Sequence, residues 1–126
     1  MEGISHRTIK IVGPCKSGKT TLAAGLVELG FVARSCSQEH SDVATMWQRI
    51  EPARWLVFLD VSLAAIRARS PRSDWSEAVL EQQLHRLAHA RRHADLVILT
   101  DEMQPDQVLA RVVEFLLKND VLPIEG

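Results

Sequence analysis

The chain contains 126 residues, of which 46% are hydrophobic and 25% are charged, a composition typical of one folded domain. Its 15 basic and 16 acidic residues leave a net charge of −1. This balance argues against a broad basic surface for nucleic acid or for an anionic membrane.

The sequence also bears on where the protein works. No apolar run approaches the length of a membrane span, and the first ten residues lack the hydrophobic segment of a secretory signal. Cys15 and Cys36 are too few for a disulfide framework. We therefore expect a reducing, cytoplasmic setting.

The first part of the chain predicts alternating strands and helices. Residues 8–12 (TIKIV) predict a short buried strand, and a helix is expected over residues 19–29, where Gly30 suits the position after the helix end. Residues 31–35 (FVARS) predict a second strand. Ser41 predicts the start of another helix. The apolar positions of that helix are Val43, Met46, Trp47 and Ile50.

The alternation continues to the end of the chain. Residues 54–60 (RWLVFLD) predict a strand buried on both faces, and residues 62–69 a short helix. A long helix is expected over residues 75–92, followed by a strand at 95–99. Pro105 suits the first turn of a last helix.

This alternation indicates an α/β fold in a single domain. Strands joined through helices form right-handed crossovers, which produce a parallel sheet covered by helices on both faces. We expect about four parallel strands, in the order second, first, third, fourth. Ligands of such sheets bind beyond the carboxyl ends of the strands.

Residues 13–20 (GPCKSGKT) match the phosphate-loop pattern Gly-x-x-x-x-Gly-Lys-[Ser/Thr] between a predicted strand and a predicted helix. Gly13 and Gly18 permit a tight turn whose N–H groups face an anion, and the helix N-terminus adds partial positive charge. Lys19 can reach the β- and γ-phosphates, and the Thr20 hydroxyl can bind Mg²⁺. The predicted nucleotide-binding residues are Gly13, Pro14, Cys15, Lys16, Ser17, Gly18, Lys19, Thr20 and Thr21.

The loop predicts Mg²⁺ and a nucleoside triphosphate but no particular reaction. The Asn-Lys-x-Asp and Asp-x-x-Gly motifs of GTPases are not found in the sequence. The choice between ATP and GTP is open. Lys16 either adds a phosphate contact or points to solvent, and we expect the solvent orientation.

Two carboxylates are candidates to complete the site. Asp60 ends the strand expected next to the first one, so it is either the Mg²⁺ partner or a residue that caps the strand end. Glu39 follows the second strand with Gln38 and His40, and it is either a metal ligand, a general base or an ordinary loop acid. Because a strand end fixes a side chain better than a loop does, we assign Asp60 to the metal and Glu39 to proton transfer.

The segments that follow the loop resemble the small P-loop nucleoside and nucleotide kinases, such as adenylate and shikimate kinases. The resemblance lies in LVFLDVSLAAIRARS (residues 56–70) and ADLVILTDEMQPDQVLARVVEFL (residues 94–116). It implies a three-layer P-loop NTPase-like fold that uses Mg·ATP and a small phosphate acceptor. It also implies that Arg67 lies near the adenine or phosphates, and that Arg69 and Arg72 are lid arginines.

The chain departs from that family in two respects. The family usually has five core strands, whereas four are found here, and only residues 36–53 are available to bind an acceptor. We therefore keep two functions: an ATP-dependent phosphotransferase acting on a small molecule, and a nucleotide-binding regulatory or interaction module without transfer. Nucleic acid and membrane partners are not expected, and the oligomeric state is open.

His85, His89 and His93 recur every four residues on the predicted long helix. Two histidines at this spacing can share a metal ion, but the apolar stripe of the helix lies elsewhere. We expect this histidine face to be solvated.

Overall fold

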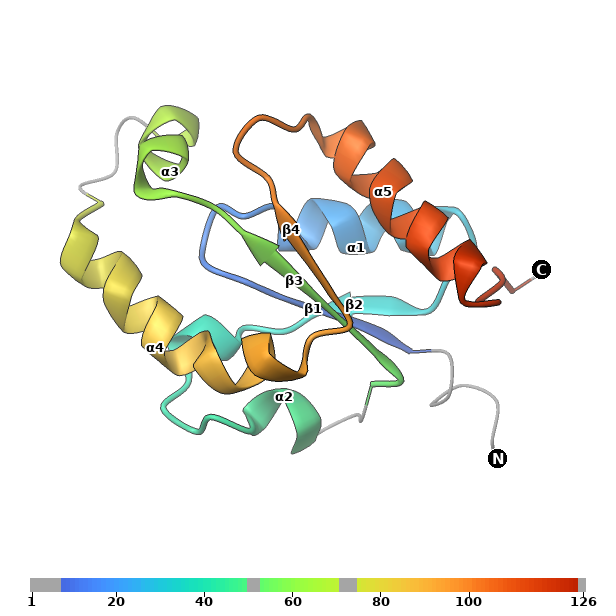
Figure 1. Cartoon of the computed structure of the whole chain (residues 1–126), viewed down its shortest axis with the longest axis horizontal. Helices are drawn as coiled ribbons and strands as arrows, with labels where there is room; N and C mark the ends of the chain where they lie inside the picture. The colour runs from blue at the N-terminus through green and yellow to red at the C-terminus, as the bar shows by residue number, and fades with distance from the viewer. Residues whose placement is uncertain (1–7, 50–52, 71–74, 125–126) are drawn as a thin grey trace.

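A parallel sheet of four strands forms the centre of the fold (Figure 1). The computed structural model describes residues 8–49, 53–70 and 75–124. The strands are β1 (Ile9–Val12), β2 (Ala33–Ser35), β3 (Trp55–Asp60) and β4 (Leu96–Leu99). Their order is β2-β1-β3-β4, and each neighbouring pair is parallel. The predicted α/β class and strand order are confirmed.

Helices cover both faces of this sheet, as Figure 1 shows. On one face lie α1 (Lys19–Glu28) and α5 (Pro105–Lys118), and on the other lie α2 (Met46–Arg49) and α4 (Glu77–His93). The remaining helices are the 3₁₀ turn η1 (Gln38–His40) and α3 (Leu63–Arg69). Among the described residues, no helix combines the length and the apolar character needed to cross a bilayer.

Strand alternation divides the apolar side chains into two main cores. Val57 and Leu59 of β3 pack with the core that α1 and α5 cover. Leu56 and Phe58 of the same strand point the other way, into the core that contains Leu87 of α4. Successive side chains of a strand face opposite sides, so the parity of a position decides which helix layer it meets.

Short local signals set the helix ends. Gly30 has a φ of 98° just after α1. Phe31 N–H bonds to Leu26 O at 2.9 Å across this turn, which is the Schellman arrangement. Ser62 Oγ accepts from Ala65 N–H at the start of α3, and Ser76 accepts in the same way at the start of α4.

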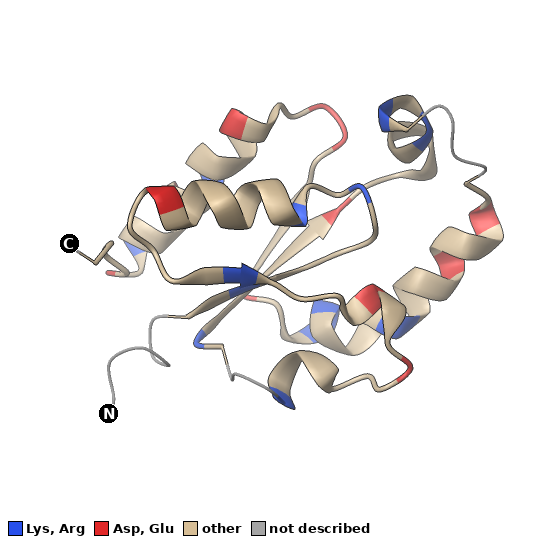
Figure 2. Ribbon diagram, turned by 180° about the vertical axis from the view of Figure 1, so that it is seen from behind, with Lys and Arg blue, Asp and Glu red and all other residues tan. Residues whose placement is uncertain are grey.

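The charged residues of α4 match its helix dipole, with acidic residues toward its N-terminus and basic residues toward its C-terminus (Figure 2). Glu77 lies in the first turn, and Arg91, Arg92 and His93 lie in the last. Negative charge near the N-terminus and positive charge near the C-terminus each stabilise a helix by roughly 0.3–1 kcal/mol.

The segment between β2 and β3 differs from the sequence prediction. The helix expected from Ser41 is confirmed only over the short α2, because residues 41–45 form no helix. Gln38, which is fully buried, accepts from Trp47 N–H at 2.8 Å and donates to Val43 O at 2.8 Å and to Arg86 O at 3.3 Å. Ser41 Oγ accepts from Val43 N–H within a turn. One buried amide therefore replaces the helix turn that the apolar spacing favoured.

We predict that Gln38→Ala lowers the free energy of unfolding by about 1–3 kcal/mol, because it leaves the buried N–H of Trp47 without its acceptor. Urea unfolding followed by circular dichroism measures the change. Gln48→Ala, on the exposed side of α2, is the matched control and should change stability by less than about 0.5 kcal/mol. Equal effects of the two substitutions would contradict the role given to Gln38.

Candidate functional site

The loop between β1 and α1 depends on glycine where it passes the end of β3. Gly13 has a φ of 155°, and a Cβ there would lie 2.2 Å from the main-chain oxygen of Leu59. Only glycine lets the loop pass so closely. Gly18 precedes α1 with a φ of 99°, and Lys16 has a φ of 66°. The left-handed conformation of Lys16 costs a residue with a side chain about 1–2 kcal/mol.

The ammonium group of Lys19 folds back over this loop. It donates hydrogen bonds to the main-chain oxygens of Gly13 at 2.9 Å and Pro14 at 3.1 Å, and it lies 2.8 Å from Glu39 Oε2. The Lys19 and Glu39 side chains are 10% and 4% exposed. Water and salt screen such a partly buried ion pair much less than an exposed one. The pair therefore ties the β1–α1 loop to η1.

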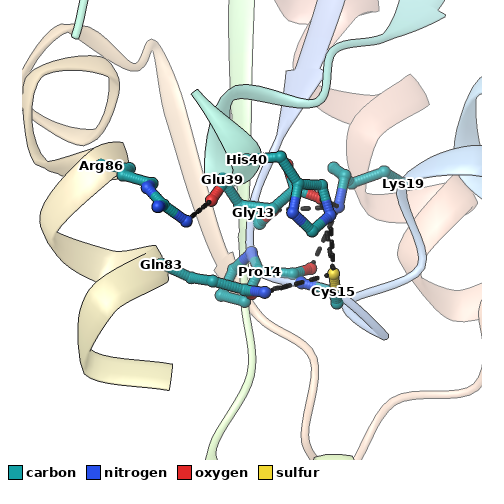
Figure 3. A network of polar contacts seen from close by, with 8 residues as sticks. All are labelled: Gly13, Pro14, Cys15, Lys19, Glu39, His40, Gln83 and Arg86. Atoms are coloured by element: carbon teal, nitrogen blue, oxygen red, sulfur yellow. Dashed lines mark hydrogen bonds and ion pairs between the residues drawn. The ribbon is translucent and has the colours of Figure 1, made fainter. Parts of the chain in front are cut away.

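Polar side chains of α4 hold η1 and the loop together (Figure 3). Arg86 Nη1 donates to the main-chain oxygen of Glu39 at 3.3 Å. Gln83, which is 4% exposed, accepts from Cys15 N–H at 3.0 Å, and its Nε2 lies 3.4 Å from Cys15 Sγ. With the buried Gln38, these contacts form a polar seam between η1 and α4.

Cys15 and His40 lie beside the Lys19–Glu39 ion pair. Cys15 Sγ is 3.3 Å from His40 Nε2 and 3.8 Å from Glu39 Oε2. The His40 side chain is 58% exposed, so it forms the solvent side of this cluster. Gln38, Glu39 and His40, which the sequence placed together at the sheet edge, all belong to η1.

A pocket of about 430 Å³ opens on the α3–α5 side of the loop. This volume lies in the range of small-molecule sites. The residues that line it come from the loop and α1, the end of α3, the segment between β4 and α5, and the start of α5. They are Lys16, Ser17, Gly18, Thr21, Leu22, Ala68, Arg69, Thr100, Asp101, Met103, Gln104, Pro105 and Val108.

Arg69 joins the loop to the end of β4 across this pocket. Its Nη1 donates to Lys16 O at 2.7 Å, and its Nη2 donates to Thr100 O at 2.7 Å. Nearby, Asp101 Oδ1 accepts from Ser62 N–H at 2.8 Å. The side-chain and main-chain hydrogen bonds from Ser62 hold the pKa of the Asp101 carboxyl below its ordinary value.

Asp60 is bound by groups other than Lys19. Its Oδ2 is 2.8 Å from Arg91 Nη1, and its Oδ1 accepts from Val61 N–H at 2.9 Å. Asp60 is two residues after Phe58 on β3, so both side chains face the side of the sheet that α4 covers. The structure therefore brings Glu39 to Lys19, whereas it brings Asp60 to Arg91.

The other predicted residues are spread over the site and its surroundings. Thr20 and Thr21 are exposed in the first turn of α1, and Lys16 is exposed on the loop. Arg67 Nε donates to Trp75 O at 3.1 Å rather than reaching the loop. Arg72 lies outside the described residues, as does part of the segment expected to form a lid.

The histidines of α4 are not all solvated as the sequence suggested. Trp47 Nε1 donates to His89 Nδ1 at 3.1 Å, and the His89 and His93 rings lie 4.4 Å apart. Desolvation, with the positive charge of neighbouring His93 and Arg92, lowers the pKa of His89. His85 is exposed. These contacts give His89 a packing role beside α2.

Sequence reasoning missed the α4 side chains that complete the site. Gln83 lies on the buried stripe of α4 with Leu80 and Leu87, so a polar residue at an apolar helix position was the signal that could have found it. Arg86 carried no such signal. Asp101 carried a usable signal, because it follows the fourth strand at the edge where the loop lies.

The fold and site define a class: an α/β protein whose parallel sheet carries a glycine-dependent loop at its carboxyl edge. No protein-family model matches the chain, and no curated protein matches it with significant similarity. A four-stranded parallel sheet with helices is compatible with a P-loop fold and with other α/β folds. Function must therefore be argued from the site itself.

We predict an interaction energy between Lys19 and Glu39 in the folded protein. Lys19→Met leaves a buried carboxylate without its cation and should lower the free energy of unfolding by about 3 kcal/mol. Glu39→Gln should cost less, because Lys19 keeps its two main-chain acceptors. Adding Glu39→Gln to Lys19→Met should restore most of the loss, as measured by urea unfolding of the four proteins. Strictly additive effects would exclude the coupling.

Proposed function

We propose that the chain is a P-loop protein that binds the phosphates of a nucleoside triphosphate, ATP or GTP, with residues 13–20. The observation that carries the proposal is the position of Lys19, whose ammonium group lies against two oxygens of the loop and Glu39. A phosphate oxygen offers Lys19 a charge-assisted bond that can replace a neutral carbonyl contact. The N-terminus of the ten-residue α1 adds partial positive charge at the same loop.

The pocket beside the loop suits the nucleoside part of such a ligand. It shares Ser17, Gly18 and Thr21 with the loop and extends to Arg69 and Thr100. A nucleotide whose phosphates lie on the loop can therefore direct its nucleoside toward a pocket of about 430 Å³. Its lining combines polar groups with apolar side chains such as Leu22, Met103 and Val108, and small-molecule sites typically combine the two.

Two buried polar atoms without hydrogen-bond partners support the proposal that a ligand or ion binds at this loop. Ser17 Oγ and Glu39 Oε1 are both buried and have no hydrogen-bond partner among the described residues. Buried polar atoms without partners are rare and usually await a water, an ion or a ligand. Oxygen ligands of this kind suit Mg²⁺, and we assign the Thr20 hydroxyl and the Glu39 carboxylate as its protein partners. The ion would supply charge neutralisation on the phosphates.

Glu39 replaces Asp60 in this proposal as the carboxylate that serves Mg²⁺. The Asp60 oxygens are already held by Arg91 and by Val61 N–H, whereas Glu39 has a free oxygen beside Lys19. We propose phosphoryl transfer to a small acceptor as the reaction. Lys19 and Arg69 would stabilise negative charge on the transferred phosphoryl group.

Lys19→Ala should remove most of the nucleotide affinity, because it deletes the charge-assisted contact to the phosphates. Isothermal titration calorimetry with Mg·ATP and Mg·GTP measures the loss, and circular dichroism establishes that the variant is folded. Lys118→Ala, which removes an exposed lysine from α5, is the control and should bind normally. Unchanged binding by a folded Lys19→Ala protein would put the nucleotide site elsewhere.

Glu39→Gln should weaken the Mg²⁺ dependence of nucleotide binding and lower phosphoryl transfer, because a neutral amide is a poor metal ligand. Asp60→Asn should leave the Mg²⁺ dependence unchanged. Nucleotide affinity with and without Mg²⁺, and ATP turnover with a panel of hydroxylated metabolites, test both variants. Loss of Mg²⁺ dependence in Asp60→Asn alone would return the metal to Asp60. Tight binding without acceptor-stimulated turnover would favour the nucleotide-binding module.

A further inference from the structure

Three different metal-ligating groups meet at the edge of the β1–α1 loop (Figure 3). Cys15 contributes its thiol from the loop, and η1 contributes the Glu39 carboxylate and the His40 imidazole. Cys15 Sγ lies 3.3 Å from His40 Nε2 and 3.8 Å from Glu39 Oε2, and His40 Nε2 lies 3.7 Å from Glu39 Oε2. The three atoms thus form a nearly equilateral triangle.

The size of this triangle fits one tetrahedral metal ion. Zinc binds sulfur at about 2.3 Å and nitrogen or oxygen at about 2.0–2.2 Å, which puts the ligand atoms of a tetrahedral site about 3.3–3.7 Å apart. The three observed separations, 3.3, 3.7 and 3.8 Å, differ from this range by a few tenths of an ångström at most. Small side-chain adjustments are therefore enough to bring all three atoms to a shared ion.

The chemistry of the three groups selects the kind of metal. Mg²⁺ and Ca²⁺ prefer oxygen ligands, whereas a thiolate with an imidazole and a carboxylate suits Zn²⁺. Glu39 provides a second indication: its side chain is 4% exposed, and Oε1, the oxygen that is not paired with Lys19, has no hydrogen-bond partner among the described residues. A buried carboxylate oxygen without a partner is costly, and a cation bound to the carboxylate would satisfy it.

The surroundings hold these ligands in position without a metal. Gln83 fixes Cys15 through its main-chain N–H and lies against its sulfur, while Arg86 holds the main chain of Glu39. Lys19 shares Glu39 Oε2, but it also has Gly13 O and Pro14 O as acceptors. It can therefore yield the carboxylate to a metal ion and keep two hydrogen bonds.

We propose that Cys15, Glu39 and His40 bind one Zn²⁺ ion, with a fourth position left for water or an external ligand. Zinc binds the thiolate, so loading the site releases the thiol proton of Cys15. Three protein ligands and an open position are the pattern of zinc sites that act on a bound molecule rather than only hold the fold.

The site is tested on the full chain without nucleotide, because Mg²⁺–nucleotide binding would also engage Glu39. Zn²⁺ affinity is measured by competition with a chromophoric chelator, and Co²⁺ replaces Zn²⁺ for absorption spectroscopy. We expect one equivalent of metal and a thiolate-to-cobalt charge-transfer band. Cys15→Ser should abolish that band, and Cys15→Ser and His40→Gln should each weaken Zn²⁺ binding roughly tenfold or more, since even partners outside the ligand shell change affinity by about 10–100-fold.

Cys36→Ser and His85→Gln are the matched controls, because they remove the other thiol and an exposed histidine of α4. Both should retain the band and the affinity of the unmodified chain. Absence of the band, or its loss in Cys36→Ser with retention in Cys15→Ser, would overturn the proposal. Loss of binding in His85→Gln alone would move the metal to α4. Each result is read without nucleotide, so failure here leaves the phosphate loop proposal intact.

Discussion

The ion pair between Lys19 and Glu39 constrains the arrangement of the site. Each side chain is largely buried, so each charge needs the other to offset the loss of water. Along the chain, Lys19 precedes β2, at the start of α1, and Glu39 follows it, in η1. Their pairing requires β2 to lie next to β1, and the observed register places these strands side by side.

The loop is held from both sides rather than by its own turn alone. Glu39 binds Lys19 on one side, and Arg69 binds the main-chain oxygen of Lys16 on the other. Arg69 also bonds to Thr100 at the end of β4. The loop is therefore connected to both outer strands of the sheet, although it directly follows only β1. Such fixed surroundings favour the preorganisation that a binding site needs.

A polar seam with α4 gives this arrangement its rigidity on the η1 side. Gln38 replaces several main-chain hydrogen bonds at once, and Gln83 and Arg86 reach the loop and Glu39 from the same helix. Fully connected polar networks specify one arrangement of their elements, because each displaced member leaves a buried group unpaired. The seam explains how residues with weak helical signals keep a defined conformation.

The sequence determined the parallel sheet, the glycine-dependent loop and the helix end at Gly30, because alternation, glycine spacing and capping are local signals. The sequence also predicted that Glu39 lies at the same edge of the sheet as the loop, because Glu39 follows the strand next to β1. Only the tertiary structure decided the partners of the two carboxylates. Asp60 has the parity that faces α4 and meets Arg91, whereas Glu39 meets Lys19. The position of a residue along a strand decides which face of the sheet its side chain meets. Packing between residues that are distant in the chain decides which helix covers that face.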